Sequence, residues 1–175
     1  MNIGIDIGST AAKAAALEGA DLVATIVIPT GFNGVDAAMR LADALREQGI
    51  DPTACDANVI ATGYGRVSVP YAAKTVTEIT CHGRGAAFLF DRDGTVIDVG
   101  GQDTKVIQLA DGKVRKFVMN DKCAAGTGKF LEVIADRMGV TQNDLATLAS
   151  QGEPTPISSM CTVFAESEVI SLIGR

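Results

Sequence analysis

Two short segments of this sequence carry the same charged residues at the same spacing. Residues 5–17 read Ile-Asp-Ile-Gly-Ser-Thr-Ala-Ala-Lys-Ala-Ala-Ala-Leu, and residues 97–109 read Ile-Asp-Val-Gly-Gly-Gln-Asp-Thr-Lys-Val-Ile-Gln-Leu. Five of the thirteen positions are identical, and the copies lie 92 residues apart, which is too far for the repeat unit of a solenoid. In each copy an apolar segment runs into a glycine turn and a second segment follows. The repeat predicts two lobes built on one plan.

The chemistry that these segments could perform is the binding of phosphate and Mg²⁺. A turn of the form Asp-x-Gly exposes backbone N–H groups, and glycine permits a close approach to an anion. Asp6 and Asp98 would lie where a hydrated Mg²⁺ bridges to phosphate, because Mg²⁺ keeps waters and takes one or two protein carboxylates. An ordinary hairpin would explain one copy, but two matched copies favour a phosphate site. The further candidate ligands are Gly8, Ser9, Thr10, Lys13, Gly100, Gly101, Gln102 and Lys105.

Two of the four cysteines lie in segments that suit metal chemistry. Residues 120–132 read Asn-Asp-Lys-Cys-Ala-Ala-Gly-Thr-Gly-Lys-Phe-Leu-Glu, and residues 158–168 read Ser-Ser-Met-Cys-Thr-Val-Phe-Ala-Glu-Ser-Glu. We expect Cys123 and Cys161 each in the first turn of a helix, the second one capped by Ser158 or Ser159. The helix dipole, and Lys122 beside Cys123, favour the thiolate form. Such thiolates suit an iron–sulfur cluster of net negative charge.

The number of cysteines then bears on how a cluster could be held. A 4Fe–4S cluster takes four cysteine ligands, so a two-fold dimer could hold one cluster with Cys123 and Cys161 of both subunits. A single-chain site with all four cysteines is the rival, but the sequence has no Cys-x-x-Cys pair, the usual signature. Burial as small apolar side chains is the other alternative, and we expect it for Cys55 and Cys81.

Several other residues have a functional and a structural interpretation. Gly126, Thr127 and Gly128 could let a nucleotide approach the helix that carries Cys123. Lys129 and Glu132 could contact a nucleotide or form a surface pair, and Gln102 and Asp103 could orient the attacking water or shape a hairpin. Residues 63–66 could be a phosphate-side loop, an interface loop or a plain turn. We expect His82 to be a local structural histidine.

Hydrophobic periodicity supplies the elements that must position these residues. The helix expected at 34–48 has Val35, Ala38, Leu41, Ala42 and Leu45 on one face and ends at Gly49. A helix at 122–138 has Asp121 as its N-cap and groups Phe130, Leu131, Ile134 and Met138 on one side. Strands are expected at 2–7, 12–18, 22–28, 57–61, 94–99, 104–109 and 113–118, and further helices at 77–90, 143–150 and from 161 onward.

Composition excludes several classes of protein. The chain has 175 residues, of which 47% are hydrophobic and 21% charged, so it can bury a core. A net charge of −6 with few aromatic residues argues against a nucleic-acid or anionic-membrane surface. The sequence contains no run of about 18 apolar residues and no signal peptide, so we expect a cytoplasmic protein with no membrane partner.

The paired hairpins resemble the phosphate-1 and phosphate-2 loops of the actin, sugar kinase and heat-shock chaperone ATPase superfamily. That resemblance implies an α/β fold in which two ribonuclease-H-like lobes of mixed sheet and helices close over ATP and Mg²⁺. The stretches Ile97–Lys105, Asn120–Glu132 and Ser159–Leu172 resemble motifs of a narrower family. It is that of the ATP-dependent activators of 2-hydroxyacyl-CoA dehydratases, with the ATPase subunits of benzoyl-CoA reductase as relatives.

The narrower resemblance implies a specific function. It implies a homodimer with one bridging 4Fe–4S cluster on Cys123 and Cys161, ATP hydrolysis to ADP, and transfer of one low-potential electron to a dehydratase component. Reduced ferredoxin or flavodoxin would recharge the cluster. A small-molecule kinase of the acetate or sugar kinase type, with Asp98 as base, and a non-catalytic nucleotide-binding domain are the alternatives.

The turn at residues 91–94 is the expected boundary between the lobes. It divides the chain into a first lobe at 1–92, with the first hairpin, and a second lobe at 93–175, with the second hairpin and both cluster cysteines. Family members are longer than 175 residues. The resemblance therefore implies that the rest of the second lobe, including the groups that hold adenine, lies outside this sequence.

Overall fold

The structure is a computed structural model that describes all residues except 121–123, 159–160 and 175. The chain forms two compact units. The first contains Met1–Asp93 and Ala110–Val114, and the second contains Gly94–Leu109 and Arg115–Arg175. The short Ala110–Val114 segment is the tip of a hairpin whose two strands otherwise belong to the second unit.

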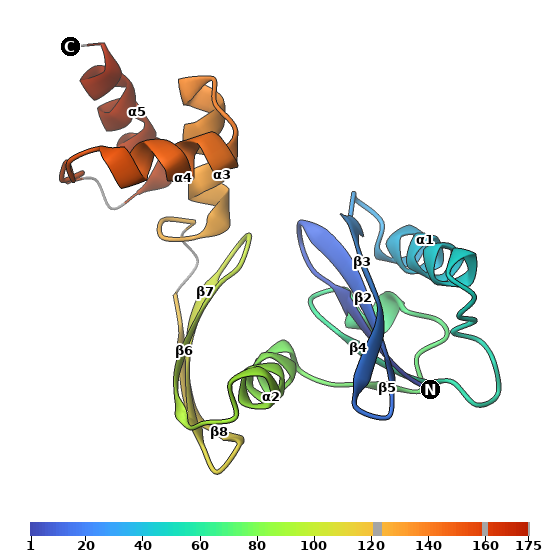
Figure 1. Cartoon of the computed structure of the whole chain (residues 1–175). Helices are drawn as coiled ribbons and strands as arrows, with labels where there is room; N and C mark the ends of the chain where they lie inside the picture. Colours follow the sequence, from blue (N-terminus) through green and yellow to red (C-terminus); the bar gives the residue numbers. More distant parts are fainter. Residues whose placement is uncertain (121–123, 159–160, 175) are drawn as a thin grey trace. The chain divides into compact units, whose positions relative to one another are not determined.

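The first unit is built on a five-stranded mixed sheet (Figure 1). Its spatial order is β3-β2-β1-β4-β5, in which β1, β2 and β3 form an antiparallel meander and β4 and β5 run parallel to β1. The predicted strands are confirmed to within a residue or so, whereas β5 was not predicted. The bounds are β1 Asn2–Ile7, β2 Ala11–Glu18, β3 Asp21–Pro29, β4 Asn58–Thr62 and β5 Lys74–Thr75.

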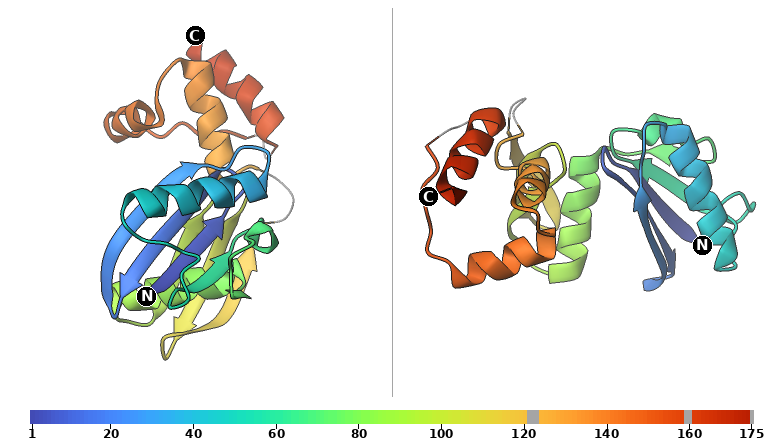
Figure 2. Two further views of the ribbon diagram at one scale, coloured as in Figure 1. Left: turned by 90° about the vertical axis from the view of Figure 1, so that its right-hand side faces the viewer. Right: turned by 90° about the horizontal axis from the view of Figure 1, so that it is seen from above.

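Helix α1 (Gly34–Glu47) covers one face of this sheet, as Figure 2 shows. Asn33 caps the helix, because its Oδ1 accepts hydrogen bonds from the backbone N–H groups of Val35 at 2.9 Å and Asp36 at 3.3 Å. Four of the five residues expected on the apolar face are buried, whereas Val35 is half exposed. Ala37, which was not predicted, is buried as well. The core under α1 comprises Ile3, Ile5, Ile7, Ala12, Ala14, Ala38, Leu41, Leu45, Val59 and Ala61.

Two further helical elements belong to the first unit. A 3₁₀ turn, η1 (Arg66–Ser68), follows β4, and α2 (Glu78–Phe90) follows β5. Between them Tyr71 anchors the loop to α1 by donating a hydrogen bond from its hydroxyl to the Ala38 carbonyl oxygen at 2.6 Å. Burial raises the pKa of Tyr71 to about 12, so this phenol remains a donor throughout the neutral range.

The second unit combines a three-stranded sheet with three helices (Figures 1 and 2). Its sheet has the order β6-β7-β8 and is formed by the predicted strands. Helix α3 contacts both α4 and α5, so the helices form one cluster. The bounds are β6 Gly94–Val99, β7 Thr104–Ala110, β8 Lys113–Met119, α3 Gly128–Met138, α4 Gln142–Gln151 and α5 Thr162–Ile173.

The predicted start of the third helix is wrong. We expected a helix from residue 122 with Asp121 as N-cap, but Ala124–Thr127 is a turn and α3 begins at Gly128 with Thr127 as N-cap. Gly126 has φ +74°, which interrupts any helix at that point. Ile134 is buried as predicted, whereas Leu131 and Met138 remain substantially exposed. Asp121 itself lies outside the described residues.

The predicted cap of the last helix is also wrong. Cys161 is the N-cap residue of α5, and its own side chain makes no capping hydrogen bond. Ser158 instead uses its backbone N–H to donate to Glu168 Oε1 at 3.0 Å, while Ser159 lies outside the described residues. In the part of the chain that the structure describes, no helix is long and apolar enough to cross a membrane.

The backbone pairing bears out the internal repeat. In the first unit Asp6 faces Lys13 across β1 and β2, and in the second unit Asp98 faces Lys105 across β6 and β7. The two hairpins therefore share one register as well as one sequence pattern. Because register decides which side chains share a face, the Asp–Lys pair occupies the same place in both hairpins.

Candidate functional site

The first hairpin presents Asp6 and Lys13 as an ion pair. Lys13 Nζ lies 2.9 Å from Asp6 Oδ2. The N–H of Gly8 donates to the Ala11 carbonyl oxygen at 3.2 Å and closes the turn, and a Cβ at Gly8 would lie 2.7 Å from that same oxygen. Of the predicted ligands at this turn, Ser9 and Thr10 are the exposed ones.

The second hairpin has the same plan but a more enclosed lysine. Lys105 is 2% exposed, pairs closely with Asp103, and has its Nζ 3.8 Å from Asp98 Oδ2. The N–H of Gly100 donates to the Asp103 carbonyl oxygen at 2.8 Å. Asp103 thus contributes to the hairpin with both its backbone and its carboxylate. Gln102 is exposed at the turn, and its role toward an attacking water stays a prediction.

Helix α3 begins directly on the second hairpin. The N–H groups of Gly128 and Lys129 donate to the carbonyl oxygens of Gly100 and Gly101 at 2.8 and 3.1 Å. A Cβ at Gly128 would lie 3.1 Å from the Gly100 oxygen, so glycine permits this approach. Thr127 is buried, and its hydroxyl donates to the Ala124 carbonyl oxygen at 2.5 Å.

Further along α3, Lys129 and Glu132 form a pair of the kind expected at a helix surface. Lys129 Nζ lies 3.0 Å from Glu132 Oε1, and each side chain is about half exposed. The sequence left open whether these residues contact a nucleotide or each other. The pair that they form satisfies both charges, and contact with a nucleotide stays a prediction.

The described cysteines differ in their surroundings. Cys161 is exposed at the N-terminus of α5, a place where the dipole favours a thiolate. Cys123 lies outside the described residues. Cys55 is exposed, so its predicted burial is wrong: it belongs to the loop between α1 and β4. Cys81 is partly buried on α2.

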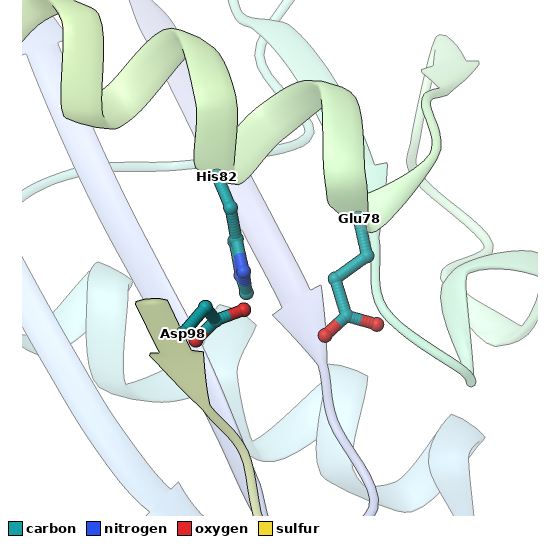
Figure 3. A group of neighbouring side chains, drawn as sticks. All are labelled: Glu78, His82 and Asp98. Carbon is teal, nitrogen blue, oxygen red and sulfur yellow. The ribbon is translucent and has the colours of Figure 1, made fainter. Parts of the chain in front are cut away.

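A cavity of about 430 Å³ lies within the first unit, against the strands that carry Asp6 and Lys13. Cys81 and His82 contribute to its wall from α2, and most of its lining is apolar. Figure 3 shows that His82 and Glu78, which is one turn away, project from the same side of α2; it also draws Asp98, which belongs to β6 of the second unit. His82 therefore faces this cavity, a role that the sequence did not predict.

The structure adds Thr62 and Gly63 to the residues around Asp6. Thr62 is the parallel register partner of Asp6, and a Cβ at Gly63 would overlap Asp6 Oδ1. The sequence pattern marked the glycines of residues 63–66 but could not identify what they approach. One feature of the sequence could have indicated that Thr62 and Gly63 lie near Asp6. They follow a predicted strand, and the ends of neighbouring parallel strands meet at one edge of a sheet.

The duplicated strand hairpins with their Asp–Lys registers define the chain as an actin-type ATPase fold, and comparison with solved structures agrees. The chain matches component A of the (R)-2-hydroxyglutaryl-CoA dehydratase of Acidaminococcus fermentans with a TM-score of 0.89 and 44% identity, covering 99% of this chain and 68% of that one. It also matches the activator of the 2-hydroxyisocaproyl-CoA dehydratase from Clostridium difficile with bound ADPNP, with a TM-score of 0.88 and 42% identity, covering 99% and 65%.

The chain belongs to the BadF/BadG/BcrA/BcrD ATPase family, which matches residues 3–173. It is 49% identical to the uncharacterized protein YjiL of Escherichia coli, covering 98% of this chain and 66% of the relative. It is 47% identical to the activator of lactoyl-CoA dehydratase of Anaerotignum propionicum, covering 99% and 68%. The chain thus spans about two thirds of the length of these relatives. The narrower family resemblance inferred from the sequence is confirmed.

Proposed function

We propose that this chain is the nucleotide-binding and cluster-binding part of an ATP-hydrolysing activator that transfers one low-potential electron to a 2-hydroxyacyl-CoA dehydratase or a related reductase component. The observation that carries the proposal is the duplicated hairpin, with Asp6 facing Lys13 and Asp98 facing Lys105, in a chain similar to named dehydratase activators over nearly its whole length. The proposed reaction is therefore inferred from the relatives, and the proposed nucleotide-binding residues are inferred from the two hairpins.

The residues present fit ATP with Mg²⁺. Asp6 Oδ1 is buried with no hydrogen-bond partner among the described residues, and a free carboxylate oxygen is the kind of ligand that Mg²⁺ or its waters take. Lys13 and Lys105 would add positive charge near the phosphates. Because the N–H groups of Gly8 and Gly100 are used inside the hairpins, the proposed phosphate donors are the other turn residues. These are the exposed Ser9, Thr10 and Gln102 and the partly buried Gly101. Bound Mg²⁺ would neutralise phosphate charge.

Cys161 fits a ligand of a 4Fe–4S cluster shared by two subunits. Its thiol is exposed at a helix N-terminus, where a second subunit could approach it and where the dipole favours the thiolate. Four thiolates are needed, so we propose that Cys123 is the second ligand from each subunit of a homodimer. The cluster would store one electron, supplied by a reduced ferredoxin or flavodoxin in the cytoplasm.

The described residues on either side of residues 121–123 are attached to the second hairpin. Asn120 Oδ1 accepts from the Thr104 N–H at 2.7 Å, the Thr104 hydroxyl donates to the Gly126 carbonyl oxygen at 2.5 Å, and Gly128 donates to Gly100. We propose that this segment couples nucleotide at the hairpin to the cluster. Exchange of Thr127 for a bulky residue should then reduce nucleotide-dependent changes in cluster exposure while the cluster stays bound.

Anaerobic purification tests the proposal directly. Visible absorbance with iron and sulfide analysis should give about one 4Fe–4S cluster per dimer. Cys161→Ser should abolish it, because serine cannot replace the thiolate. Cys55→Ser is the matched control, since Cys55 is also an exposed free cysteine, and it should leave the iron content unchanged. An iron-free protein that phosphorylates a small molecule would contradict the proposal.

A further inference from the structure

A row of three polar side chains crosses the first sheet beside the proposed nucleotide site. Asp6 of β1 is the register partner of Lys13 on β2 and of Thr62 on β4, so the three side chains share one face of the sheet. All three line the cavity of about 430 Å³. A mostly apolar cavity with a few convergent polar groups is typical of a ligand site.

The carboxylate of Asp6 is only half satisfied. Its Oδ2 accepts from Lys13 Nζ at 2.9 Å, whereas its Oδ1 is buried and has no partner among the described residues. A buried polar atom without a hydrogen bond costs free energy. A ligand that reaches Oδ1 and donates a hydrogen bond or carries positive charge would therefore remove this cost.

Thr62 has a second buried side-chain oxygen without a hydrogen-bond partner among the described residues. This oxygen is Oγ1, and the residue as a whole is 8% exposed. Adjacent strands lie about 4.8 Å apart, so a carboxylate and a hydroxyl on register partners can serve one small ligand. Oxygen ligands combined with retained waters are the preference of Mg²⁺.

The loop after β4 is held against the end of β1. The N–H of Gly65 donates to the Ile7 carbonyl oxygen at 2.8 Å, and Arg66 Nη1 donates to the Gly63 carbonyl oxygen at 3.1 Å. Gly63 has φ +84° and leaves no room for a Cβ, which would overlap Asp6 Oδ1 and lie 2.5 Å from the Ile7 oxygen. Residues 63–66 are therefore a loop built against Asp6.

We propose that Thr62 Oγ1 and Asp6 Oδ1 together bind the hydrated Mg²⁺ that accompanies the nucleotide, and that Gly63 keeps this niche open. Thr62 acts as a positioning residue for the cation and its waters. The inference rests on the proposed nucleotide-binding function. It adds the end of β4 and the loop of residues 63–66 to the two hairpins as parts of the nucleotide site.

Thr62→Val tests the hydroxyl, because valine keeps the shape of the side chain. Loss of one hydrogen bond to a charged group should raise the Mg²⁺ concentration for half-maximal binding of ADPNP about tenfold. The melting temperature without ligand should be unchanged or higher, since an unpartnered buried hydroxyl is removed. Thr25→Val is the matched control: Thr25 lines the same cavity on β3, and its change should leave the Mg²⁺ dependence unaltered.

Gly63→Ala tests the loop, with Gly49→Ala as its control. Both glycines have positive φ, +84° and +79°, but a Cβ at Gly49 would meet nothing within 4 Å. Both variants should lose stability through backbone strain, and only Gly63→Ala should also lose Mg²⁺-dependent nucleotide binding. If Gly63→Ala does not fold, the Thr62→Val measurement decides.

The outcomes separate this inference from the proposed function. Wild-type protein that binds ADPNP with a Mg²⁺ dependence unchanged in Thr62→Val would overturn the inference alone. An equal loss in Thr25→Val would also overturn it. Wild-type protein that binds neither Mg²⁺ nor ADPNP would overturn the inference and the nucleotide-binding function together.

Discussion

At the scale of single residues, the two lysines of the repeat have the same sequence context and different environments. The side chain of Lys13 is 46% exposed and forms one ion pair, with Asp6. Lys105 is 2% exposed and lies beside both Asp98 and Asp103. Asp103 has no acidic counterpart in the first copy, where Ala11 holds the equivalent position. A second carboxylate thus accompanies the enclosed lysine, because a buried charge requires partners.

Replacing each lysine by methionine should lower the free energy of unfolding by different amounts, because the two lysines differ in burial. Lys105→Met removes the partner of the buried Asp103 carboxylate and of the partly buried Asp98, so the free energy of unfolding should fall by about 3–5 kcal/mol. Lys13→Met breaks a more exposed pair, and the loss should be about 0–1 kcal/mol. Urea denaturation of the two variants measures both values. Equal losses would contradict the difference in burial.

At the scale of elements, the start of α3 is held against the second hairpin, where the phosphate site is proposed. The contact consists of two backbone hydrogen bonds, from Gly128 to Gly100 and from Lys129 to Gly101. A Cβ at Gly128 would lie 3.1 Å from the Gly100 oxygen, which is a tight contact that the hairpin could accommodate only by a small shift. Tertiary packing therefore favours glycine at the start of this helix.

Gly128→Ala should weaken this contact. The added methyl group should push α3 from the hairpin and lower the free energy of unfolding by about 1 kcal/mol. Hydrogen exchange at the Lys129 amide should become faster. Gly85→Ala on α2 is the control, since a Cβ there meets nothing within 4 Å and alanine should stabilise the helix by about 0.5–1 kcal/mol. A gain in stability for both variants would contradict the prediction.

At the scale of the whole molecule, each unit contains one copy of the repeated hairpin, but the two copies differ in which side chains are buried. Ile5, Ile7 and Ala14 are buried beneath α1 in the first unit. Their counterparts Ile97, Val99 and Val106 are 71%, 54% and 40% exposed. The same face of the repeat is thus the core of one unit and an exposed apolar surface on the other.

Alanine substitutions at the matched isoleucines measure this difference. Ile5→Ala removes a side chain that is 0% exposed and should cost about 2–5 kcal/mol of unfolding free energy. Ile97→Ala changes an exposed side chain, and the effect should stay within about 0.5 kcal/mol. Chemical denaturation of the isolated chain gives both numbers. A large loss for Ile97→Ala would mean that this face is covered in solution.

The sequence by itself determined the repeat, nearly all strands and helices, and the family. These properties follow from local patterns: alternating apolar residues for the strands, a 3.6-residue period for α1, and Asp-x-Gly followed by lysine for each hairpin. They need no knowledge of distant contacts, because period and turn chemistry act within a few residues. The two hairpins were therefore predicted from the sequence, and the structure added the register that pairs Asp6 with Lys13 and Asp98 with Lys105.

Only the tertiary structure decided what lies around these residues. The start of α3 at Gly128 depends on hydrogen bonds to a hairpin about 28 residues earlier in the chain, and helix periodicity carries no information about them. Thr62 lies beside Asp6 because β4 pairs with β1 in parallel. That pairing joins residues 56 positions apart, and its register is set by packing of the whole sheet. Burial of Lys105 and exposure of Ile97 follow from the same cause: a side chain's environment is supplied by segments distant in the sequence.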